Sequence, residues 1–200
     1  TMAAQRPIYS PEEETAIMAR LWSPAIKDDP EAFVLYVFPW GQKGTPLERF
    51  KGPRRWQRKV LREIGTTLKN NLFALSIEQQ INAVRKAIVS GRGVGKSALV
   101  SWLILWMLST RIGTTVIVSA NSENQLRKVT WGELTKWATM SFNAHWWEPT
   151  ATSLNPAQWL TTLVEQDLKI GTRYWSAEGK LWSEENPDGY AGAHNVYGMM

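Results

Sequence analysis

The chain has 200 residues, which is enough for one well-buried domain and too few for two large ones. Its net charge of +5 fits a polyanionic partner, and a mildly basic surface without such a partner fits it equally well. The lack of cysteine excludes disulfides and thiolate metal sites, and two histidines far apart in the sequence argue against a zinc site.

The first fifty residues carry the signals of short helices. A Ser-Pro-Glu-Glu sequence at residues 10–13 combines a capping serine, a first-turn proline and a glutamate that reaches back, so it predicts a helix that runs to about Trp22. An Asp-Pro pair repeats this pattern before residues 31–38, and three glycines and three prolines make residues 39–53 a loop. We therefore expect residues 1–50 to form a helical segment that packs as a lid or brace over the rest of the chain.

Residues 54–69 predict an amphipathic helix. Apolar side chains share one face and basic side chains the opposite face: Val60, Leu61, Ile64 and Leu68 against Arg55, Arg58, Lys59 and Arg62. Between positions 43 and 69 there are nine basic residues and two acidic ones, so this region could bind DNA phosphates, contact a neighbouring subunit or simply be solvated. A weaker helical pattern follows at residues 77–84.

A glycine-rich stretch at residues 90–97 matches the pattern of a phosphate-binding P-loop. It reads Ser-Gly-Arg-Gly-Val-Gly-Lys-Ser, with serine in place of the usual first glycine. Residues 86–90 predict a short buried strand before it, and residues 98–108 predict a helix that is apolar on nearly all sides and so belongs inside a domain. Strand, loop and helix follow in the order that the motif requires. The helix is far shorter than the ~20 residues of a membrane span, so we expect no membrane partner.

The motif assigns a chemical task to each part of this loop. Glycines let the backbone curl so that successive N–H groups point at phosphate oxygens, and the following helix adds its positive N-terminal end. Lys96 would neutralise the β and γ phosphates, Ser97 would give its hydroxyl to Mg²⁺, and Arg92 either contacts the γ phosphate or is a solvated loop residue. We therefore predict ATP and Mg²⁺ as ligands, with Lys96 and Arg92 as catalytic groups. The predicted nucleotide-binding residues of the loop are Ser90, Gly91, Arg92, Gly93, Val94, Gly95, Lys96 and Ser97.

The second half of the chain alternates strand-like and helical stretches. Residues 114–120 predict a strand, residues 122–140 a helical region and residues 168–175 a further strand, whereas residues 184–192 have the composition of a loop. This alternation indicates an α/β layered sheet. For residues 51–200 we expect a P-loop NTPase fold, with a mainly parallel central sheet flanked by helices and the nucleotide at the strand ends.

At the P-loop the sequence resembles the large terminase subunits of tailed bacteriophages, whose P-loops often carry an arginine. Upstream, Gly-Pro-Arg-Arg-Trp-Gln at residues 52–57 is similar to the adenine-recognition motif of that family. The resemblance implies that Gln57 holds the adenine edge with its carboxamide and that Trp56 packs nearby. A polar amide centred on the apolar face of a first helical turn needs a buried partner, and a backbone group would serve as well as a ligand.

Two further stretches resemble the family more weakly. Residues 116–125 look like the strand and helix start that follow its P-loop helix, although Ser122 and Gln125 also form an ordinary capping box. Residues 189–194 resemble the loop before the acidic strand of the family. The acidic strand itself, an apolar run that ends in Asp-Glu, is missing from the sequence, and the nearest imitation, residues 161–165, is too short and lacks the adjacent acid.

By this resemblance, we expect the chain to be the front part of a motor ATPase whose acidic strand and metal-dependent nuclease domain lie outside these 200 residues. Such a fragment would hydrolyse ATP hardly at all, because the metal-positioning and general-base groups are missing. The whole motor would couple ATP hydrolysis to pushing double-stranded DNA into a procapsid in the host cytoplasm. Its partners would be further copies in a homo-oligomeric ring, a small terminase subunit and the portal.

Two other interpretations stay open. A helicase or another nucleic-acid-remodelling P-loop ATPase would share Lys96 and Ser97 but need not have the Trp-Gln motif. A chain that is complete in itself would be a nucleotide-binding or purely structural module. Such a module should avoid an open sheet edge and exposed apolar surface.

Overall fold

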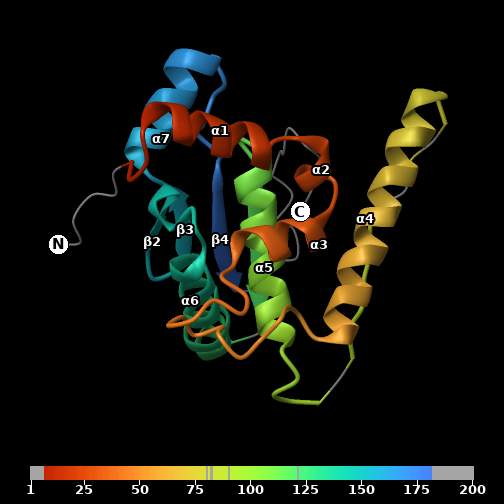
Figure 1. Ribbon diagram of the computed structural model, residues 1–200. Coiled ribbons are helices and arrows are strands. Elements are labelled where there is room, and N and C mark those ends of the chain that lie inside the picture. Colours follow the sequence, from red (N-terminus) through yellow and green to blue (C-terminus); the bar gives the residue numbers. More distant parts are fainter. Residues whose placement is uncertain (1–6, 80, 82, 90, 121, 182–200) are drawn as a thin grey trace.

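The computed structural model describes residues 7–79, 81, 83–89, 91–120 and 122–181, and these form a four-stranded mixed sheet flanked by helices (Figure 1). The helices are α1 (Pro11–Leu21), α2 (Pro24–Lys27), α3 (Pro30–Val37), α4 (Arg55–Ser76), α5 (Lys96–Thr110), α6 (Gly132–Met140) and α7 (Gln158–Leu163). The strands are β1 (Thr115–Ala120), β2 (Trp147–Pro149), β3 (Ser153–Pro156) and β4 (Ser176–Leu181). No helix in these ranges combines the length and the apolar character that a membrane crossing requires.

The sheet is mixed, which corrects the prediction of a mainly parallel one. Its strand order is β1-β4-β3-β2, and β1 pairs in parallel with β4, whereas β3 pairs antiparallel with both β4 and β2. The backbone N–H of Thr150 donates to the carbonyl of Ser153 at 2.8 Å, so β2 and β3 form a hairpin, whose strands must run antiparallel. With three and four residues, β2 and β3 are too short to show the periodicity on which the prediction rested.

The helix starts of the N-terminal segment form as predicted. The Ser10 hydroxyl accepts from the N–H of Glu13 at 3.2 Å, and the Glu13 carboxylate accepts from the N–H of Ser10 at 2.8 Å. At the start of α3 the Asp29 carboxylate accepts from the N–H of Ala32 at 3.0 Å. Residues 39–53 contain neither helix nor strand, in agreement with the predicted loop.

Buried polar contacts join the N-terminal helices to the rest of the chain. The indole N–H of Trp106 on α5 donates to the carbonyl of Ile26 at 3.2 Å. Glu14 on α1 is 3% exposed and accepts from the ring of His145 and, at 3.1 Å, from the indole of Trp146. Helices α1 to α3 therefore lie against the end of α5, as Figure 1 shows.

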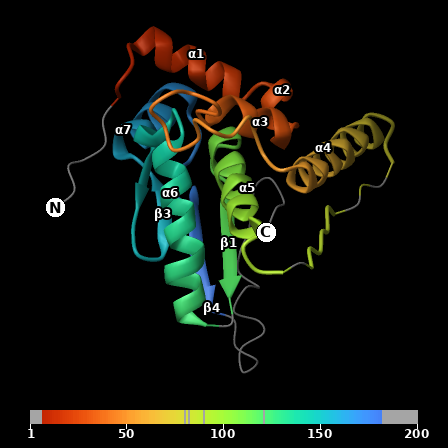
Figure 2. The ribbon, with the colours of Figure 1, turned by 60° about the horizontal axis from the view of Figure 1, so that its bottom comes forward.

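Helix α5 forms the centre of the body. It is buried on nearly all sides, as its sequence predicts, and lies beside α6 over the strands (Figure 2). Trp102 on α5 is 2% exposed and makes edge contacts with Trp40 and Trp137, at centroid distances of 5.8 and 5.0 Å. Such rings bury large apolar areas, so this tryptophan cluster contributes strongly to the stability of the body.

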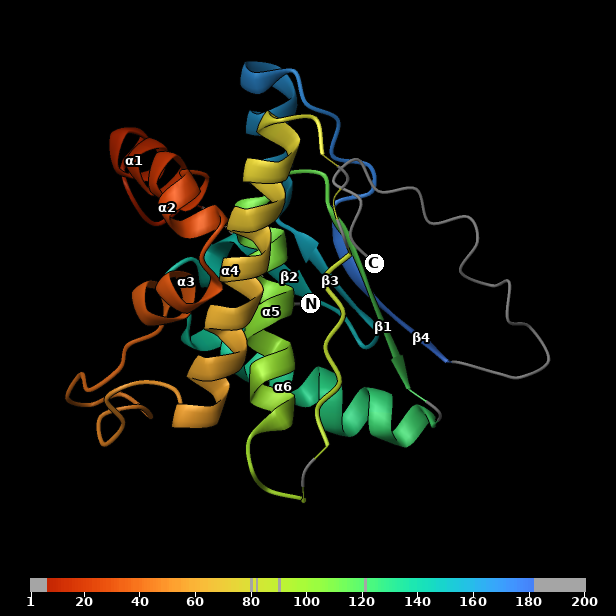
Figure 3. The same ribbon diagram turned by 90° about the vertical axis from the view of Figure 1, so that its right-hand side faces the viewer.

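Helix α4 begins where predicted but runs further, to Ser76 instead of about Lys69. Its last turns expose large apolar side chains, among them Phe73 at 67%. The predicted helical stretch at residues 77–84 does not form in the described residues of that range, which are turns and irregular chain. Figures 2 and 3 show α4 standing apart from the sheet.

The strand predicted at residues 86–90 is wrong for the four residues of it that the structure describes. Residues 86–89 are irregular, and Val89 is 98% exposed. The ammonium of Lys86 lies 2.7 Å from the Glu63 carboxylate, so the segment is tied to α4 and does not pair with β1. In Figure 3 it descends from the end of α4 toward the start of α5 without joining the sheet. Ser90 lies outside the described residues.

In the second half the first strand and the following helical region are confirmed. Strand β1 matches residues 114–120, and a π-helical stretch, Gln125–Trp131, continues into α6. The hydroxyl of Ser122 accepts from the N–H of Gln125 at 3.2 Å, in keeping with the capping box. The weak family resemblance of this stretch stays a prediction.

The strand expected within residues 168–175 is misplaced, because β4 begins at Ser176. Lys169 adopts a left-handed backbone conformation with φ of 56°, which ends the preceding helical stretch in a turn. The indole N–H of Trp175 donates to the carbonyl of Leu108 at 3.0 Å and anchors the chain directly before the strand. The predictions for residues 184–192 and 189–194 lie outside the described residues.

Candidate functional site

The glycine-rich loop adopts the backbone conformation for which its glycines are needed. Gly93 has φ of 72° and Gly95 has φ of 93°, both in the left-handed region that other residues rarely adopt. A Cβ atom added at Gly91 or Gly93 would meet nothing within 4 Å, so space beside this part of the turn is open. The described part of the loop therefore has two left-handed positions, at which a backbone can turn sharply.

The loop leads directly into α5, so it meets the N-terminal end of that helix. Gly95 is the N-cap, and its carbonyl accepts the first intrahelical hydrogen bond from the N–H of Leu99 at 3.2 Å. The N–H groups of the first helical turn lie before that bond, so their acceptors must come from outside the helix. The first turn of α5 contains no acidic residue. Because the N-terminal end of a helix carries partial positive charge, this point favours an anion.

The side chains that the motif assigns to catalysis surround this helix start. The ammonium of Lys96 donates to the carbonyl of Gly91 at 3.3 Å and so reaches back across the loop. Arg92 is exposed, and Ser97 is half-buried in the first turn of α5. The structure thus brings Arg92, Lys96 and Ser97 to one loop and one helix end, as the sequence predicts.

The first turn of α4 is attached to the same loop. Gln57 is 3% exposed, and its amide donates to the carbonyl of Gly95 at 2.9 Å while its oxygen accepts from the N–H of Arg54 at 2.8 Å. The indole N–H of Trp56 donates to the carbonyl of Val94 at 3.2 Å. Gln57 is therefore a backbone-capping residue in this structure, one of the two roles left open by the sequence.

The contact between Gln57 and Gly95 is a feature that sequence reasoning missed. A Cβ atom at Gly95 would lie 2.7 Å from the Gln57 amide nitrogen, so the close approach depends on glycine at this position. Arg54 adds a third contact, from its guanidinium to the carbonyl of Val94 at 3.3 Å. Periodicity places Gln57 on a buried face but cannot name a partner 38 positions away.

The site fits phosphate better than it fits an isolated metal ion. Within the described residues no three His, Asp or Glu side chains gather where they could hold a metal. Residues 161–165, the nearest imitation of an acidic strand, are helical, and the carboxylate of Glu165 accepts from the hydroxyl and the N–H of Thr172. For a Mg²⁺ ion the site would supply the Ser97 hydroxyl as one ligand, and phosphate oxygens and water would be the others.

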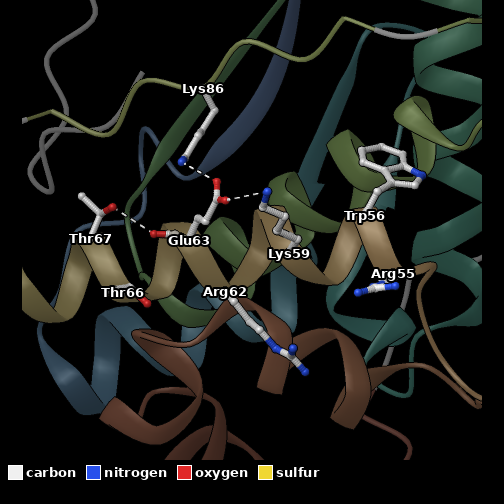
Figure 4. A pocket seen from close by; sticks show the side chains of 8 residues that line it. All are labelled: Arg55, Trp56, Lys59, Arg62, Glu63, Thr66, Thr67 and Lys86. Atoms are coloured by element: carbon white, nitrogen blue, oxygen red, sulfur yellow. Dashed lines mark hydrogen bonds and ion pairs between the residues drawn. The ribbon is translucent and has the colours of Figure 1, made fainter.

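A large open cavity lies beside α4, next to the loop. Its volume is about 1000 Å³, and Figure 4 shows it between α4 and the segment that carries Lys86. The lining residues are Arg55, Trp56, Lys59, Arg62, Glu63, Thr66, Thr67 and Lys86. A smaller hollow of about 290 Å³ is lined by apolar side chains of α5 and by residues of β1, which is an edge strand of the described sheet.

Comparison of the chain with family models, with curated proteins and with solved structures gave no match. The features that define the site are the two left-handed glycines, the start of α5 directly after them and the contacts from α4.

Proposed function

We propose that the chain is the ATP-binding part of a DNA-packaging motor of the large terminase type. Such a motor couples ATP hydrolysis to the movement of double-stranded DNA into a procapsid. The observation that supports the proposal is a turn with left-handed Gly93 and Gly95 that leads into the N-terminal end of α5, whose first turn holds no acidic residue. The motor would act in the host cytoplasm as a ring, with a small terminase subunit and a portal as partners.

In this proposal each group of the loop has a distinct role toward ATP and Mg²⁺. The backbone N–H groups of the loop and of the start of α5 bind phosphate oxygens. Lys96 leaves the Gly91 carbonyl and neutralises the β and γ phosphates, and Arg92 contacts the γ phosphate. The Ser97 hydroxyl is one ligand of the magnesium ion.

Because Gln57 is attached to the loop, the proposed contact with adenine would change how the loop is held. Because Gln57 is buried against Gly95, its amide must leave that carbonyl before it can bind the edge of a base. The binding of adenine by Gln57 would then break the hydrogen bond between Gln57 and Gly95, so the loop would be released in the same step. Trp56, whose indole N–H holds the carbonyl of Val94, would move with them.

The alternatives make different demands on the same features. A helicase-like ATPase would use the same lysine and serine, but it gives no reason for a Trp-Gln pair attached to the loop. A stand-alone module should have protected sheet edges, and in the described part of the chain β1 is an edge strand beside an open apolar hollow. Both observations favour the motor.

The proposal is tested by the binding of a fluorescent ATP analogue in the presence of Mg²⁺. Lys96→Ala removes charge-assisted hydrogen bonds of about 1.5–3 kcal/mol, so affinity should fall roughly tenfold to a hundredfold. Lys136→Ala is the control, because Lys136 is a 58% exposed cation on α6. Equal affinity of the Lys96 variant and the unmodified chain would refute the proposal. Turnover should be negligible, and appreciable hydrolysis that disappears in Lys96→Ala would show that the general base has been overlooked.

A further inference from the structure

The face of α4 that lines the large cavity carries a row of cations. Arg55, Lys59 and Arg62 follow one another at helical spacings of four and three residues, so their backbone positions share one face of the helix. In Figure 4 the Lys59 side chain turns toward Glu63, whereas that of Arg62 points the other way. Lys86 faces this row from the opposite wall of the cavity (Figure 4). We call these four residues the basic stripe.

The charge of the basic stripe is only partly neutralised by the protein. Glu63 is the one acidic residue that lines the cavity, and Glu31 outside the lining pairs with Arg62, so two acidic residues face four cations. Its carboxylate lies 2.7 Å from the ammonium of Lys86 but 3.9 Å from that of Lys59, whose side chain is 78% exposed. Arg55 has no ion pair within the described residues. The cavity therefore keeps an excess of positive charge that is open to solvent.

The helix that carries the stripe is held in place before any ligand binds. On the side toward α3, the carboxylate of Glu31 forms ion pairs with Arg58 at 2.6 Å and Arg62 at 2.5 Å. At the N-terminal end, Trp56 and Gln57 attach the helix to the loop. A binding surface that is already rigid loses little conformational entropy on association.

From these observations we propose that the basic stripe binds the phosphate backbone of a nucleic acid. Lysine and arginine side chains and threonine hydroxyls commonly contact phosphates. Thr66 and Thr67 extend the row along the cavity. The lining residues of α4 run from Arg55 to Thr67, about 18 Å along the helix, which is the rise of roughly five base pairs. This inference rests on the proposed function and adds to it the surface that touches DNA.

The chemistry of the cavity favours a nucleic acid over a second copy of the chain. The centres of protein interfaces are depleted of lysine and built around apolar and aromatic anchors. Here Trp56 is the only aromatic residue in the lining, and its indole N–H is already bonded to the loop. The rest of the lining is basic or polar, which suits an extended polyanion.

The experiment measures the binding of a labelled DNA duplex of about 20 base pairs, several times the length of the lining along α4, over a range of salt concentrations. The test variant is Arg55→Ala/Lys59→Ala, in which alanine preserves the helix. The control is Arg127→Ala/Lys136→Ala, which removes the same amount of charge. These two side chains are 49% and 58% exposed, and neither lines the cavity. The affinity for single-stranded DNA of the same length and the affinity for nucleotide are measured on the same samples. Sedimentation reports whether these samples self-associate.

We expect the test variant to bind duplex at least about tenfold more weakly near 0.1 M salt, with the slope of log K against log salt reduced by about two. The control should keep the affinity and slope of the unmodified chain. Equal losses in the two variants, or no loss in either, would overturn the inference. A change in self-association without a change in DNA binding would also overturn it and identify the stripe as an interface between copies.

The proposed ATP site is judged separately. If Lys96→Ala leaves nucleotide binding unchanged while the test variant still loses DNA, the motor proposal fails and the basic stripe stands. If nucleotide binding behaves as predicted and DNA binding does not, only the proposal that the basic stripe binds nucleic acid is rejected. Weaker binding of single strands than of duplex would show that the stripe follows the regular spacing of a double helix.

Discussion

The body of the molecule and the region around α4 are held together by different interactions. In the body, α5 lies between the N-terminal helices and the sheet, and five tryptophans are at most 2% exposed: Trp102, Trp106, Trp146, Trp147 and Trp175. Around α4 the pattern is reversed, since Phe73 is 67% and Val89 98% exposed. Leu61 and Ile64 in the first half of α4 are buried in the core, and ion pairs to Glu31 and hydrogen bonds to the loop carbonyls add to this attachment.

This difference indicates which region responds to ligands. Burial of large apolar side chains is strong and non-directional, so the body should keep its shape whatever binds. A single hydrogen bond contributes only about 0.5–1.5 kcal/mol, so the contacts between α4 and the loop can be exchanged for contacts to a nucleotide. The body therefore acts as a support, and the hydrogen bonds between the loop and the first turn of α4 are the adjustable part.

The strongest test of this division removes a ring from the body. Trp102→Ala should lower the free energy of unfolding by about 3–5 kcal/mol, because the cavity it leaves lies among packed aromatic rings. Phe73→Ala on the exposed part of α4 should change it by less than about 0.5 kcal/mol. Urea unfolding followed by fluorescence measures both, and similar losses at the two positions would erase the distinction.

A second test concerns the close approach at Gly95. Gly95→Ala places a Cβ atom 2.7 Å from the Gln57 amide and forces a left-handed conformation on alanine, so we expect a loss of about 1–3 kcal/mol and faster amide exchange in the loop. Gly91→Ala is the matched control, since its Cβ would meet nothing within 4 Å. Tolerance of alanine at Gly95 would mean that α4 does not hold the loop.

The third test uses the ion pairs of Glu31. Burial alone would raise the pKa of Glu31, but hydrogen bonds from Arg62 and Arg58 and their positive charges outweigh it and lower the pKa below the ordinary 4.5. The lowered pKa means that this stabilisation is present above about pH 4.5 and is lost as the pH falls through the folded-state value.

Glu31→Gln should therefore cost about 1–2 kcal/mol at pH 7, a modest value because solvent screens arginines that are 40% and 61% exposed. The difference between variant and unmodified chain should disappear in acid. Urea midpoints across the pH range provide the measurement. A difference that persists at low pH would assign the effect to packing instead of charge.

The smallest change in stability is expected for the ion pair between Lys86 and Glu63, which joins the segment before the loop to α4. Lys86→Gln removes the ion pair with Glu63, an exposed interaction whose loss should leave the urea midpoint within experimental scatter. Exchange of the amides of residues 83–89 should nevertheless become faster. Unchanged exchange would show that something other than this pair holds the segment beside α4.

Local signals in the sequence predicted the parts whose partners lie within a few residues. The caps at Ser10 and Asp29 form as expected because the donor and acceptor are three positions apart. The burial of α5 follows from its apolar composition, and the left-handed glycines follow from the motif. These features need no knowledge of the rest of the fold.

Tertiary structure decided the features that depend on a distant partner. Residues 86–89 have the composition of a buried strand, yet they lie outside the sheet, where Lys86 contacts Glu63 of α4. The hairpin of β2 and β3 makes the sheet mixed, and Gln57 finds its partner at Gly95, 38 positions along the chain. Periodicity reports which face of an element is apolar, but only the packed molecule determines which group meets it.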